Sequence, residues 1–387
     1  MRRALALLFV VIALTAAKPL AQAAPRTLDI YYVDTEGGQA TLFVAPGGQT
    51  VLVDTGNAGT RDPQRIMEAV RAAGVKQIDY LLLTHYHGDH VGGFLELSKL
   101  IPIMHYVDHG PTVQPEQNTE SKQAYDAAIK KGPYMAAKPG DKLPIAGIDW
   151  TIVSAAGKTL KTNMAGAPGA GRPNPYCADF KPKDIQVDLE NGQSTGSVIA
   201  YGKFRTADLG DLLWNVEGEL MCPTNHIGTV DVYLTTHHGL DYSGSKVVVH
   251  ALQPRVIIMN NGTRKGGQIE PFETIESSPG LEDLWQLHWS FNGVLDHNAP
   301  SRFIANVEEP AVAAQIVANP PTPASGRLGP PLPPAPRGAG AGAAAAPPLP
   351  GNPAHSPAFW IKVSAQADGT FTVTNSRNGF SKTYRAR

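Results

Sequence analysis

The alternation of apolar and polar residues predicts short strands at the start of the chain, followed by a helix. The expected strands are rich in β-branched and aromatic residues, are separated by Gly-rich turns, and cover residues 27–34, 40–46 and 49–56. Residues 61–74 place apolar side chains at helical spacing, with Asp62 as the expected cap, Pro63 in the first turn and Gly74 at the end. The pattern therefore predicts a β-meander followed by a helix.

Strands and helices continue to alternate beyond this meander. Residues 77–84 form a predicted buried strand whose apolar run ends just before His85. The later expected elements are strands at 101–110, 148–155, 230–236 and 254–262, a hairpin at 197–211 and a helix at 122–132. The chain shows no internal repeat, and we expect one main domain over residues 24–309.

Two segments of biased composition interrupt the pattern. Residues 155–183 are rich in Gly, Pro, Ala and Lys, which predicts a surface insertion that could form a flap over a cleft. Residues 310–357 contain 14 of the 33 prolines, which predicts a flexible or polyproline-like linker. After it, residues 358–387 alternate like a β-hairpin. Because a lone hairpin is marginally stable in water, we expect it to dock on the main domain.

The first 23 residues have the organisation of a secretory signal peptide. Two arginines precede an apolar run over residues 4–17, and Ala21-Gln22-Ala23 forms a small-residue cleavage pattern. The run is short for a membrane span, so we expect a secreted or periplasmic protein with no stable span after cleavage; a retained anchor is the alternative. The 33 basic and 34 acidic side chains favour neither general nucleic-acid binding nor membrane-surface binding.

The chain contains two cysteines, Cys177 and Cys222, both next to prolines in loop-like surroundings. In an exported protein two cysteines often pair, but spacing alone does not establish the geometry of a disulfide. The sequence therefore leaves a disulfide and two free thiols as equal alternatives.

A cluster of polar residues follows the apolar strand at 77–84. The stretch Thr-His-Tyr-His-Gly-Asp-His contributes His85, His87, Asp89 and His90 within six residues. Imidazole and carboxylate groups bind zinc and related divalent metals, and ligands on a tight loop can converge on one point. A solvated histidine-rich loop would not need a buried strand leading into it, so the pattern predicts part of a metal site.

Further ligand candidates follow two later predicted strands. Asp208 and Asp211 end one of them, and His237 and His238 follow the other. Together these residues offer more ligands than one four-coordinate metal requires, which predicts two metals in one cleft bridged by a carboxylate. The sequence does not decide which of the two histidines is the ligand. Asp208 could equally cap a turn.

These motifs resemble those of the metallo-β-lactamase superfamily over residues from about Thr27 to Gly262. Asp54 matches the first motif, residues 84–90 the second, Asp211 the fourth and residues 236–239 the fifth. Within the superfamily, the chain looks most like the extracellular hydrolase domain of the DNA-uptake protein ComEC. The resemblance implies an α/β fold, the αββα sandwich of two mixed β-sheets flanked by helices.

The resemblance also implies roles for individual residues. One metal would bind His85 and His87, and the other would bind Asp89, His90 and one histidine of the fifth motif. Asp211 would bridge the metals, and Asp89 would orient the attacking water, so these two aspartates are the catalytic candidates. The residues expected to support the ligands are Asp54, Asp208 and Gln193. Gln193, with Asn191 close by, stands where the superfamily usually has a third-motif histidine.

The predicted function is that of a secreted hydrolase using a metal-bound hydroxide, with one or two divalent ions, zinc first and manganese as the alternative. The branch resemblance favours a phosphodiester or other phosphorylated substrate, and a nucleic acid enters only as a substrate. Arg264 and Lys265, in a Gly-rich loop after a strand, could bind an anionic group. The alternatives are a lactone, β-lactam or other acyl substrate at the same site, and a non-catalytic metal-binding module.

Overall fold

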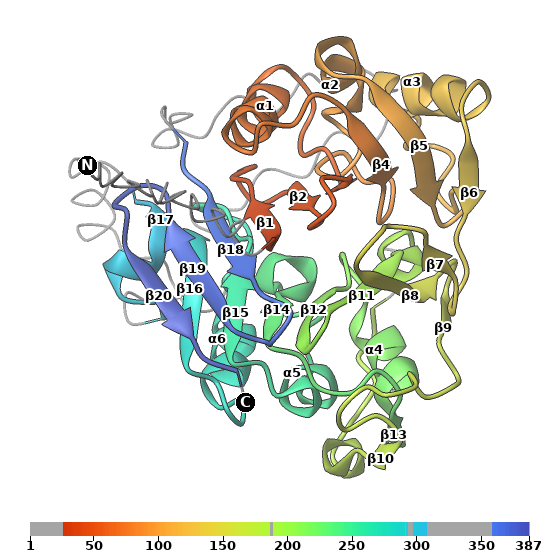
Figure 1. Ribbon diagram of the computed structural model, residues 1–387. Helices are drawn as coiled ribbons and strands as arrows, with labels where there is room; N and C mark the ends of the chain where they lie inside the picture. The colour runs from red at the N-terminus through yellow and green to blue at the C-terminus, as the bar shows by residue number, and fades with distance from the viewer. Residues whose placement is uncertain (1–25, 186–188, 291, 293–296, 308–357, 387) are drawn as a thin grey trace, which may run out of the picture.

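Two β-sheets pack face to face between two layers of helices (Figure 1). The computed structural model describes residues 26–185, 189–290, 292, 297–307 and 358–386. The predicted signal peptide and the predicted linker at 310–357 lie outside these residues. Residues 26–136 of the first sheet and its helices occupy the upper part of Figure 1, in red to yellow, and the C-terminal strands of the same sheet are drawn in blue on the left. The second sheet and its helices, in yellow-green to cyan, lie mostly below.

The first sheet has the strand order β20-β19-β18-β1-β2-β3-β4-β5-β6. Its strands are β1 (Leu28–Tyr32), β2 (Thr41–Val44), β3 (Thr50–Val53), β4 (Ile78–Leu82), β5 (Ile103–Asp108), β6 (Tyr134–Ala136), β18 (Ile361–Ala365), β19 (Phe371–Asn375) and β20 (Ser381–Tyr384). Strands β1 to β3 form the predicted antiparallel meander, whereas β3 to β6 run parallel. The sheet is therefore mixed.

The second sheet has the strand order β17-β16-β15-β14-β12-β11-β8-β7. Its strands are β7 (Lys142–Leu143), β8 (Asp149–Ala155), β11 (Gly196–Tyr201), β12 (Phe204–Asp208), β14 (Val232–Leu234), β15 (Val256–Met259), β16 (Asp283–His288) and β17 (Ile304–Asn306), with β9 (Lys158–Thr159) paired to β8. Strands β12 and β14 to β17 are parallel, and the others are antiparallel. Both sheets are mixed, as the predicted sandwich requires.

In the described part of the chain, six α-helices cover the outer faces of the two sheets. They are α1 (Arg61–Ala72), α2 (Phe94–Leu100), α3 (Glu120–Ile129), α4 (Trp214–Met221), α5 (Lys246–Leu252) and α6 (Ile269–Glu276). Helix α1 begins where the sequence predicts, but Asp62 does not cap it. The Asp62 carboxylate instead accepts a hydrogen bond from the backbone N–H of Asn57 at 2.6 Å, which ties the preceding loop to the helix. No helix in the described part of the chain combines the length and apolar character needed to span a bilayer.

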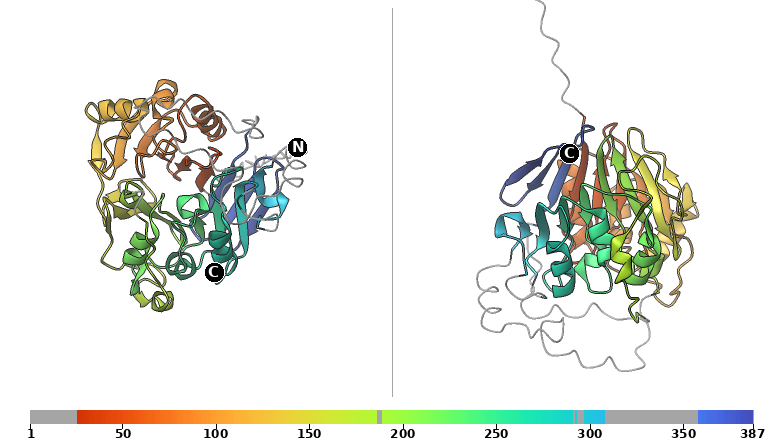
Figure 2. Two further views of the ribbon diagram at one scale, coloured as in Figure 1. Left: turned by 180° about the vertical axis from the view of Figure 1, so that it is seen from behind. Right: turned by 90° about the horizontal axis from the view of Figure 1, so that it is seen from below.

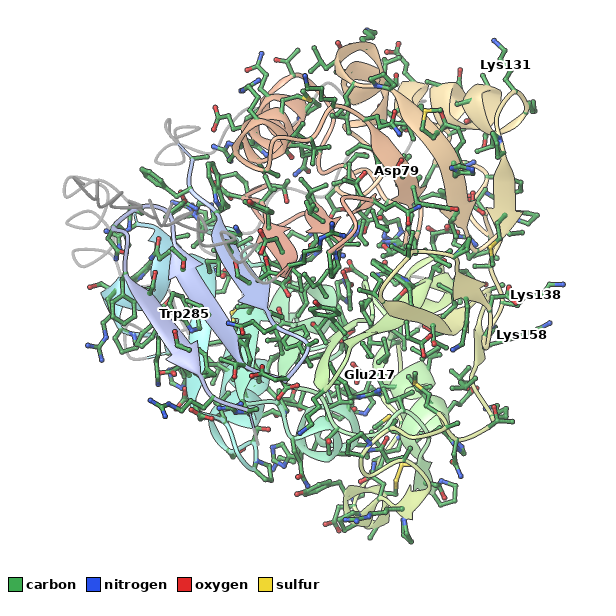
Figure 3. The ribbon with its side chains drawn as sticks, viewed as in Figure 1. Asp79, Lys131, Lys138, Lys158, Glu217 and Trp285 are labelled. Carbon is green, nitrogen blue, oxygen red and sulfur yellow. A yellow bond between two sulfur atoms is a disulfide. The ribbon has the colours of Figure 1, made fainter. Side chains whose placement is uncertain are left out.

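The period-two pattern of the strands distributes their side chains between two apolar layers. In β1, Ile30 and Tyr32 belong to the core between the sheets, whereas Tyr31 packs in the layer beneath α1 to α3. Trp285 of β16 is fully buried, whereas Lys131, Lys138 and Lys158 project from the rim (Figure 3). Successive residues of a strand point to opposite faces of the sheet. The first sheet is covered by the second sheet on one face and by helices on the other, so its strands carry apolar residues on both faces.

The C-terminal segment belongs to the first sheet. Strand β18 pairs with β1 in antiparallel register, with Ile30 opposite Val363. The segment has three strands rather than the two of the predicted hairpin, because β20 adds to β19. These strands lie at one edge of the molecule, where they extend the sheet begun by the N-terminal meander (Figures 1 and 2). A β-ribbon that shares a sheet with six other strands does not have to be stable alone.

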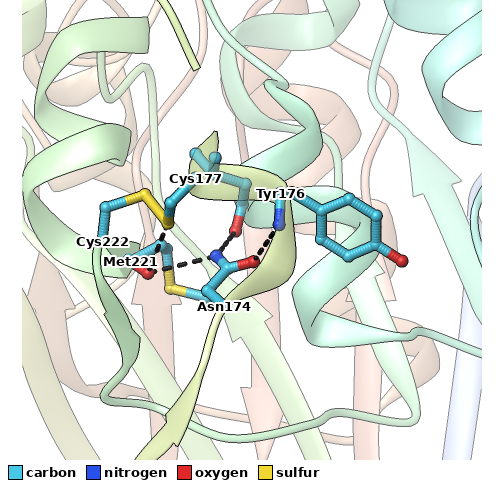
Figure 4. The surroundings of a disulfide bond; sticks show 6 residues. Asn174, Tyr176, Cys177, Met221 and Cys222 are labelled. Carbon is cyan, nitrogen blue, oxygen red and sulfur yellow. Dashed lines mark hydrogen bonds between the residues drawn. A yellow bond between two sulfur atoms is a disulfide. The ribbon is translucent and has the colours of Figure 1, made fainter. Parts of the chain in front are cut away.

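The predicted insertion at 155–183 is held against the second sheet's helices. It contains β9, β10 (Arg172–Pro173) and the 3-10 turn η1 (Pro175–Ala178), and β10 pairs with β13 (Thr224–Asn225). Cys177 in η1 forms a disulfide with Cys222 at the end of α4 (Figure 4). Asn174 adds hydrogen bonds to the carbonyl oxygens of Met221 and Val247. The open question of cysteine pairing is thus answered in favour of the disulfide.

The topology brings the predicted site residues to one edge of the sandwich. Strands β3 and β4 run parallel in one sheet, and β12, β14 and β15 run parallel in the other. The loops after these strands are residues 54–60, 83–93, 209–213, 235–245 and 260–268. Because the carboxyl ends of parallel strands lie at the same edge of a sheet, these loops can converge there.

Candidate metal centre

The loop after β4 positions its histidines through close backbone packing. A Cβ on Gly93 would lie 2.0 Å from the carbonyl oxygen of Thr55, so only glycine allows this approach. The backbone N–H and the hydroxyl of Thr55 in turn both bond the carbonyl oxygen of His90, at 2.7 and 2.8 Å. The loop is therefore fastened to the segment that follows β3, which carries Asp54.

Asp54 holds the loop and orients one of its imidazoles. Its carboxylate accepts hydrogen bonds from the backbone N–H and the hydroxyl of Thr84, both at 2.7 Å. Its Oδ2 also lies 2.7 Å from Nδ1 of His90. A proton on Nδ1, donated to the carboxylate, leaves the lone pair of His90 on Nε2, which faces the interior of the cluster. Asp54 itself has a left-handed backbone, with φ at 59°.

Replacing Asp54 with Asn should weaken metal binding by about 10- to 100-fold, because the amide cannot accept the Nδ1 proton of His90 without losing its bonds to Thr84. Competition with a chromophoric zinc chelator measures the change. The same substitution at Asp79, whose carboxylate accepts from Thr50 at the other end of β4, is the matched control and should leave the affinity unchanged (Figure 3). An Asp54→Asn protein with wild-type affinity would contradict the role assigned to Asp54.

One oxygen of Asp211 lies at the centre of the cluster. Its Oδ2 is within reach of four imidazole nitrogens: Nε2 of His90 at 3.2 Å, of His238 at 3.3 Å, of His237 at 3.5 Å and of His85 at 3.9 Å. These residues come from loops after β4, β12 and β14. Asp211 is itself buried, and its backbone N–H donates to the hydroxyl of Ser194 at 3.2 Å. The position between several histidines suits a bridging carboxylate.

Asp89 lies at the rim of the same cluster. Its Oδ2 is 3.4 Å from Nε2 of His90 and 3.4 Å from Nε2 of His238. The ammonium group of Lys265, in the loop after β15, forms an ion pair with the same oxygen. Lys265 therefore approaches the cluster from the second sheet, and its predicted role in binding an anionic substrate stays a prediction.

Two further histidines complete the arrangement on the first sheet. Nε2 of His85 and Nδ1 of His87 lie 3.0 Å apart, so these atoms can face one ion. Nε2 of His87 contacts Oε1 of Gln114 at 3.2 Å. The loop that carries Gln114 is held by buried Glu190, whose carboxylate accepts from the backbone N–H of Val113 at 3.0 Å. Neither Gln114 nor Glu190 forms part of a sequence motif, so the sequence predicts no role for these residues.

The protonation states suit metal binding. Burial lowers the pKa of His85 well below its usual value and that of His237 to about 4, so both are neutral ligand candidates near neutral pH. Burial would raise the pKa values of Asp89 and Asp211, but the cations around them hold both well below the usual range. Burial would lower the pKa of His90, yet the carboxylates around it, Asp211 first, raise it well above normal. The cluster therefore has a negative potential that favours a cation.

The donor set fits a divalent metal. Asp89, His90, Asp211 and His238 each offer one ligand atom, and these atoms all lie within 4.8 Å of one another. Among the described residues, Nε2 of His90, Nε2 of His238 and Oδ1 of Asp211 are buried and have no hydrogen-bond partner. Buried polar atoms without a partner are costly, and coordination to a metal would satisfy them. With His85 and His87 adjacent, the residues offer a candidate binuclear site.

The structure corrects the part expected of Gln193. Its side chain donates a hydrogen bond to the carbonyl oxygen of Leu189 at 3.2 Å and lies beside the turn at Gly157, away from the cluster. Asn191 faces the cluster instead. Its side chain is fully buried, and Nδ2 lies 3.3 Å from Nε2 of His237. Both residues belong to the 3-10 turn η2 (Asn191–Gln193), which directs their side chains differently.

Asp208 has the turn-capping role that the sequence left as one alternative. Its carboxylate accepts from Nε2 of Gln39 at 3.0 and 2.8 Å and from the backbone N–H of Gly210 at 3.1 Å. Burial and the nearby charge of Asp54 raise the pKa of Asp208 to about 6. These contacts place it behind the cluster. Arg264 is half-buried, and no described hydrogen bond or ion pair joins it to the cluster, unlike Lys265.

A second group of ionisable residues lies close to the site. Asp34, Glu36 and His288 bring ligand atoms within 4.8 Å of one another, although the sequence gave His288 no role. His288 Nε2 is 2.6 Å from Asp34, and Arg65 of α1 is 2.7 Å from the other oxygen of the same carboxylate. The guanidinium already balances this acidic pair, so the group is a buried ionic contact that joins β1, α1 and β16.

Comparisons with known proteins agree with this architecture. Residues 34–158 match the family described as the Metallo-beta-lactamase superfamily. An atrochrysone carboxyl ACP thioesterase of Passalora fulva is 32% identical over 110 residues, which are 27% of this chain and 33% of that protein. A hydroxyacylglutathione hydrolase of Yersinia pestis is 32% identical over 110 residues, or 28% and 35% of the two chains. The chain thus spans about a third of the length of these curated relatives.

A solved structure with a similar fold is the metallo-beta-lactamase fold protein YhfI of Bacillus subtilis. It is 14% identical, with 67% of this chain and 85% of that chain covered and a TM-score of 0.33. The family match and the two-sheet architecture together give this chain the metallo-β-lactamase fold, as the motifs predict, and they support membership of the superfamily. The fold implies the use of divalent metals. The finer resemblance to the ComEC-like branch stays a prediction.

Proposed function

We propose that this protein is a metal-dependent hydrolase whose binuclear centre is formed by residues of three loops at one edge of the sandwich. The observation that carries the proposal is the buried cluster of Asp89, His90, Asp211 and His238, with ligand atoms within 4.8 Å of one another. His85 and His87 lie beside it. Zinc is the metal that this mixture of imidazole and carboxylate ligands favours, and manganese is the alternative.

The bound metals would supply Lewis-acid polarisation of the scissile group and activation of water at neutral pH. The chain's own residues would supply the rest. Asp211 holds the two groups of histidines together through one oxygen, and Asp54 sets the orientation of His90. Asp89 lies at the rim, 19% exposed, where its carboxylate can accept a hydrogen bond from water. Lys265 supplies a positive charge at the same rim.

We propose a phosphodiester or other phosphorylated compound as the substrate class. Lys265 has a 38% exposed side chain and approaches Asp89 from the second sheet. With a metal bound by Asp89, that ammonium group would be available to an anionic substrate oxygen, and lysine binds phosphate as a point charge. A nucleic acid is one member of this class and is not required by it.

A second candidate is hydrolysis of an acyl substrate such as a thioester. The curated relatives that match part of this chain favour it, since one is described as a thioesterase and another as a hydroxyacylglutathione hydrolase. The same metal pair can polarise a carbonyl as well as a phosphoryl oxygen. Lactones and β-lactams belong to this candidate class.

A substrate panel distinguishes the candidates. Zinc- or manganese-loaded protein is assayed on bis-p-nitrophenyl phosphate, single-stranded DNA, a thioester, a lactone and nitrocefin, with His90→Ala as the metal-site variant. Phosphodiester turnover that His90→Ala abolishes is the expected result. Turnover of the acyl substrates alone would replace the substrate proposal with the second candidate. A fully metal-loaded protein inactive on every substrate would favour the non-catalytic alternative.

Lys265→Ala should raise KM for the phosphodiester about 10-fold with a smaller change in kcat, since one charge contact is worth about 1–2 kcal/mol. Steady-state kinetics at two ionic strengths measures this, because screening weakens a charge contact. Lys362→Ala, which removes a lysine that pairs with Asp29 on the first sheet, is the control. An unchanged KM in Lys265→Ala would exclude Lys265 from substrate binding.

We also propose that the protein functions outside the cytoplasm. The signal-peptide pattern of the first 23 residues supports this, and so does the Cys177–Cys222 disulfide, since structural disulfides persist mainly in oxidising compartments. Cell fractionation with a C-terminal tag, followed by N-terminal sequencing of the exported protein, tests it. A mature N-terminus near Ala24 is expected, and full-length protein in the cytoplasm would refute the proposal.

A further inference from the structure

The two adjacent histidines after β14 have an unusual backbone. Both are left-handed, with φ and ψ of 56° and 40° at His237 and of 58° and 10° at His238. Such a conformation is unfavourable for a non-glycine residue, so contacts around it must maintain it. The backbone N–H of His237 donates to Gly210 at 3.0 Å, and the carbonyl oxygen of His238 accepts from Gly267 at 3.1 Å. Both histidines are thereby held toward the cluster.

The two imidazoles reach the same oxygen but have different neighbours. Nε2 of His237 and of His238 lie 3.5 and 3.3 Å from Oδ2 of Asp211, and their ring centroids are 6.1 Å apart. His238 also approaches Asp89, at 3.4 Å, whereas the further neighbour of His237 is Asn191, at 3.3 Å. Asn191 follows Glu190, whose carboxylate accepts from the backbone N–H of Tyr86, the residue between His85 and His87, at 3.3 Å. His237 therefore lies toward the side of these two histidines, and His238 toward the side of Asp89.

The number of ligands available at each metal position indicates which metal each histidine would bind. Asp89, His90, Asp211 and His238 already supply the four ligands that a tetrahedral metal requires. His85 and His87, whose facing nitrogens lie 3.0 Å apart, would offer a second metal only two imidazoles and the shared oxygen. The third motif of the superfamily usually adds a histidine at this position, but this chain has Asn191 and Gln193 there. His237 is the remaining imidazole within reach of the shared oxygen.

The hydrogen bond of His237 to Ser243 places the lone pair of this imidazole on Nε2. The hydroxyl of buried Ser243 donates to the carbonyl oxygen of Leu212 at 2.7 Å, so its lone pair can accept from Nδ1 of His237 at 3.2 Å. A proton on Nδ1 leaves the lone pair on Nε2, the atom that faces Asp211. Nδ2 of Asn191 donates to this lone pair at 3.3 Å, so a metal would take the place of that hydrogen bond. The fully buried Oδ1 of Asn191 has no hydrogen-bond partner among the described residues, which is independent support for a cation at this position.

We propose that His237 and His238 bind different metals, and that His237 takes the place of the absent third-motif histidine beside His85 and His87. This inference rests on the proposed binuclear centre. Each metal would then have three protein ligands of its own in addition to the shared Asp211 oxygen. The sequence predicted that only one of the two histidines is a ligand; in this assignment both are ligands, each of a different metal.

Metal content of double variants tests the assignment. After equilibration with buffered Zn2+ and gel filtration, elemental analysis should find about two ions in the wild type and about one in His237→Ala or His238→Ala. His85→Ala/His237→Ala and His90→Ala/His238→Ala should each retain about one ion, because each pair removes a single site. His85→Ala/His238→Ala should retain none. Gln193→Ala, which alters an amide outside the cluster, is the control and should retain two.

Two ions in His237→Ala, or a single ion in the wild type, would overturn the proposal. Circular dichroism and thermal melting establish that each variant is folded. If His237→Ala does not fold, Ser243→Ala provides the test, since it removes the hydroxyl that orients His237, together with the bond of that hydroxyl to Leu212, and leaves every candidate ligand in place. It should weaken one of two zinc-binding constants about 10- to 100-fold and alter the Co2+ absorption spectrum. Equal weakening of both constants, or of neither, would contradict the assignment.

The same proteins separate this inference from the proposed function. The expected metal pattern without turnover on any substrate would refute the hydrolase and leave the assignment of the histidines intact. Turnover by the wild type together with two ions in His237→Ala would refute the assignment and leave the hydrolase intact.

Discussion

Replacing Asp211 with Asn should lower kcat/KM for the best substrate by about 10³-fold or more, which corresponds to about 4 kcal/mol of transition-state stabilisation. The physical reason is the position of its Oδ2, which lies within 3.9 Å of four imidazole nitrogens from two other loops. An amide keeps the shape of the side chain but loses the negative charge that two cations would share. Metal affinity at both positions should therefore fall together with activity.

Steady-state kinetics and elemental analysis on the same preparations check this expectation. The matched control is Asp283→Asn at the first residue of β16, where the carboxylate accepts from Tyr384 at 2.6 Å. Because β16 runs parallel to β15, its first residue lies at the edge of the sheet opposite the site. An Asp211→Asn protein with near wild-type kcat/KM would mean that no metal bridge contributes to catalysis.

Removing the disulfide with Cys177→Ser/Cys222→Ser should lower the free energy of unfolding by about 4 kcal/mol and Tm by about 10 °C. The two residues are 45 positions apart, and cross-linking a loop of that length restricts the unfolded chain substantially. The folded state should change little, because Asn174 still bonds Met221 and Val247 across the same contact. Activity at low temperature should consequently be retained.

Urea unfolding of the double variant, and of the wild type with and without reductant, measures the effect. Reductant should lower the midpoint of the wild type toward that of the variant and leave the variant unchanged. A double variant with the wild-type midpoint would show that the insertion at 155–183 is held by its other contacts alone.

Much of the site could be predicted from the sequence because its signals are local. The apolar run before His85 predicts a strand, and the polar residues after it are too close together to alternate between two faces of a sheet. The same reasoning applies to Asp211 and to His237, which also follow predicted strands. In each case a strand end and a ligand-type residue are neighbours in the chain, so no long-range information is needed.

The predictions failed where the orientation of a side chain depends on a short turn. Gln193 and Asn191 are two residues apart, and the sequence favoured the one nearer the expected motif. The 3-10 turn η2 instead directs Asn191 inward and Gln193 toward Leu189. Such a turn has no apolar period from which its inward face could be read.

By itself, the sequence determined the alternation of strands and helices and the identity of the polar residues at the strand ends, because strand periodicity and ligand chemistry are properties of neighbouring residues. The sandwich was predicted only from the resemblance of these motifs to those of a known superfamily. Only the tertiary structure decided that Lys265 meets Asp89, that Cys177 meets Cys222, and how His237 and His238 divide around Asp211. These relations join loops of different strands and depend on a left-handed backbone that its neighbours maintain, so no local pattern encodes them.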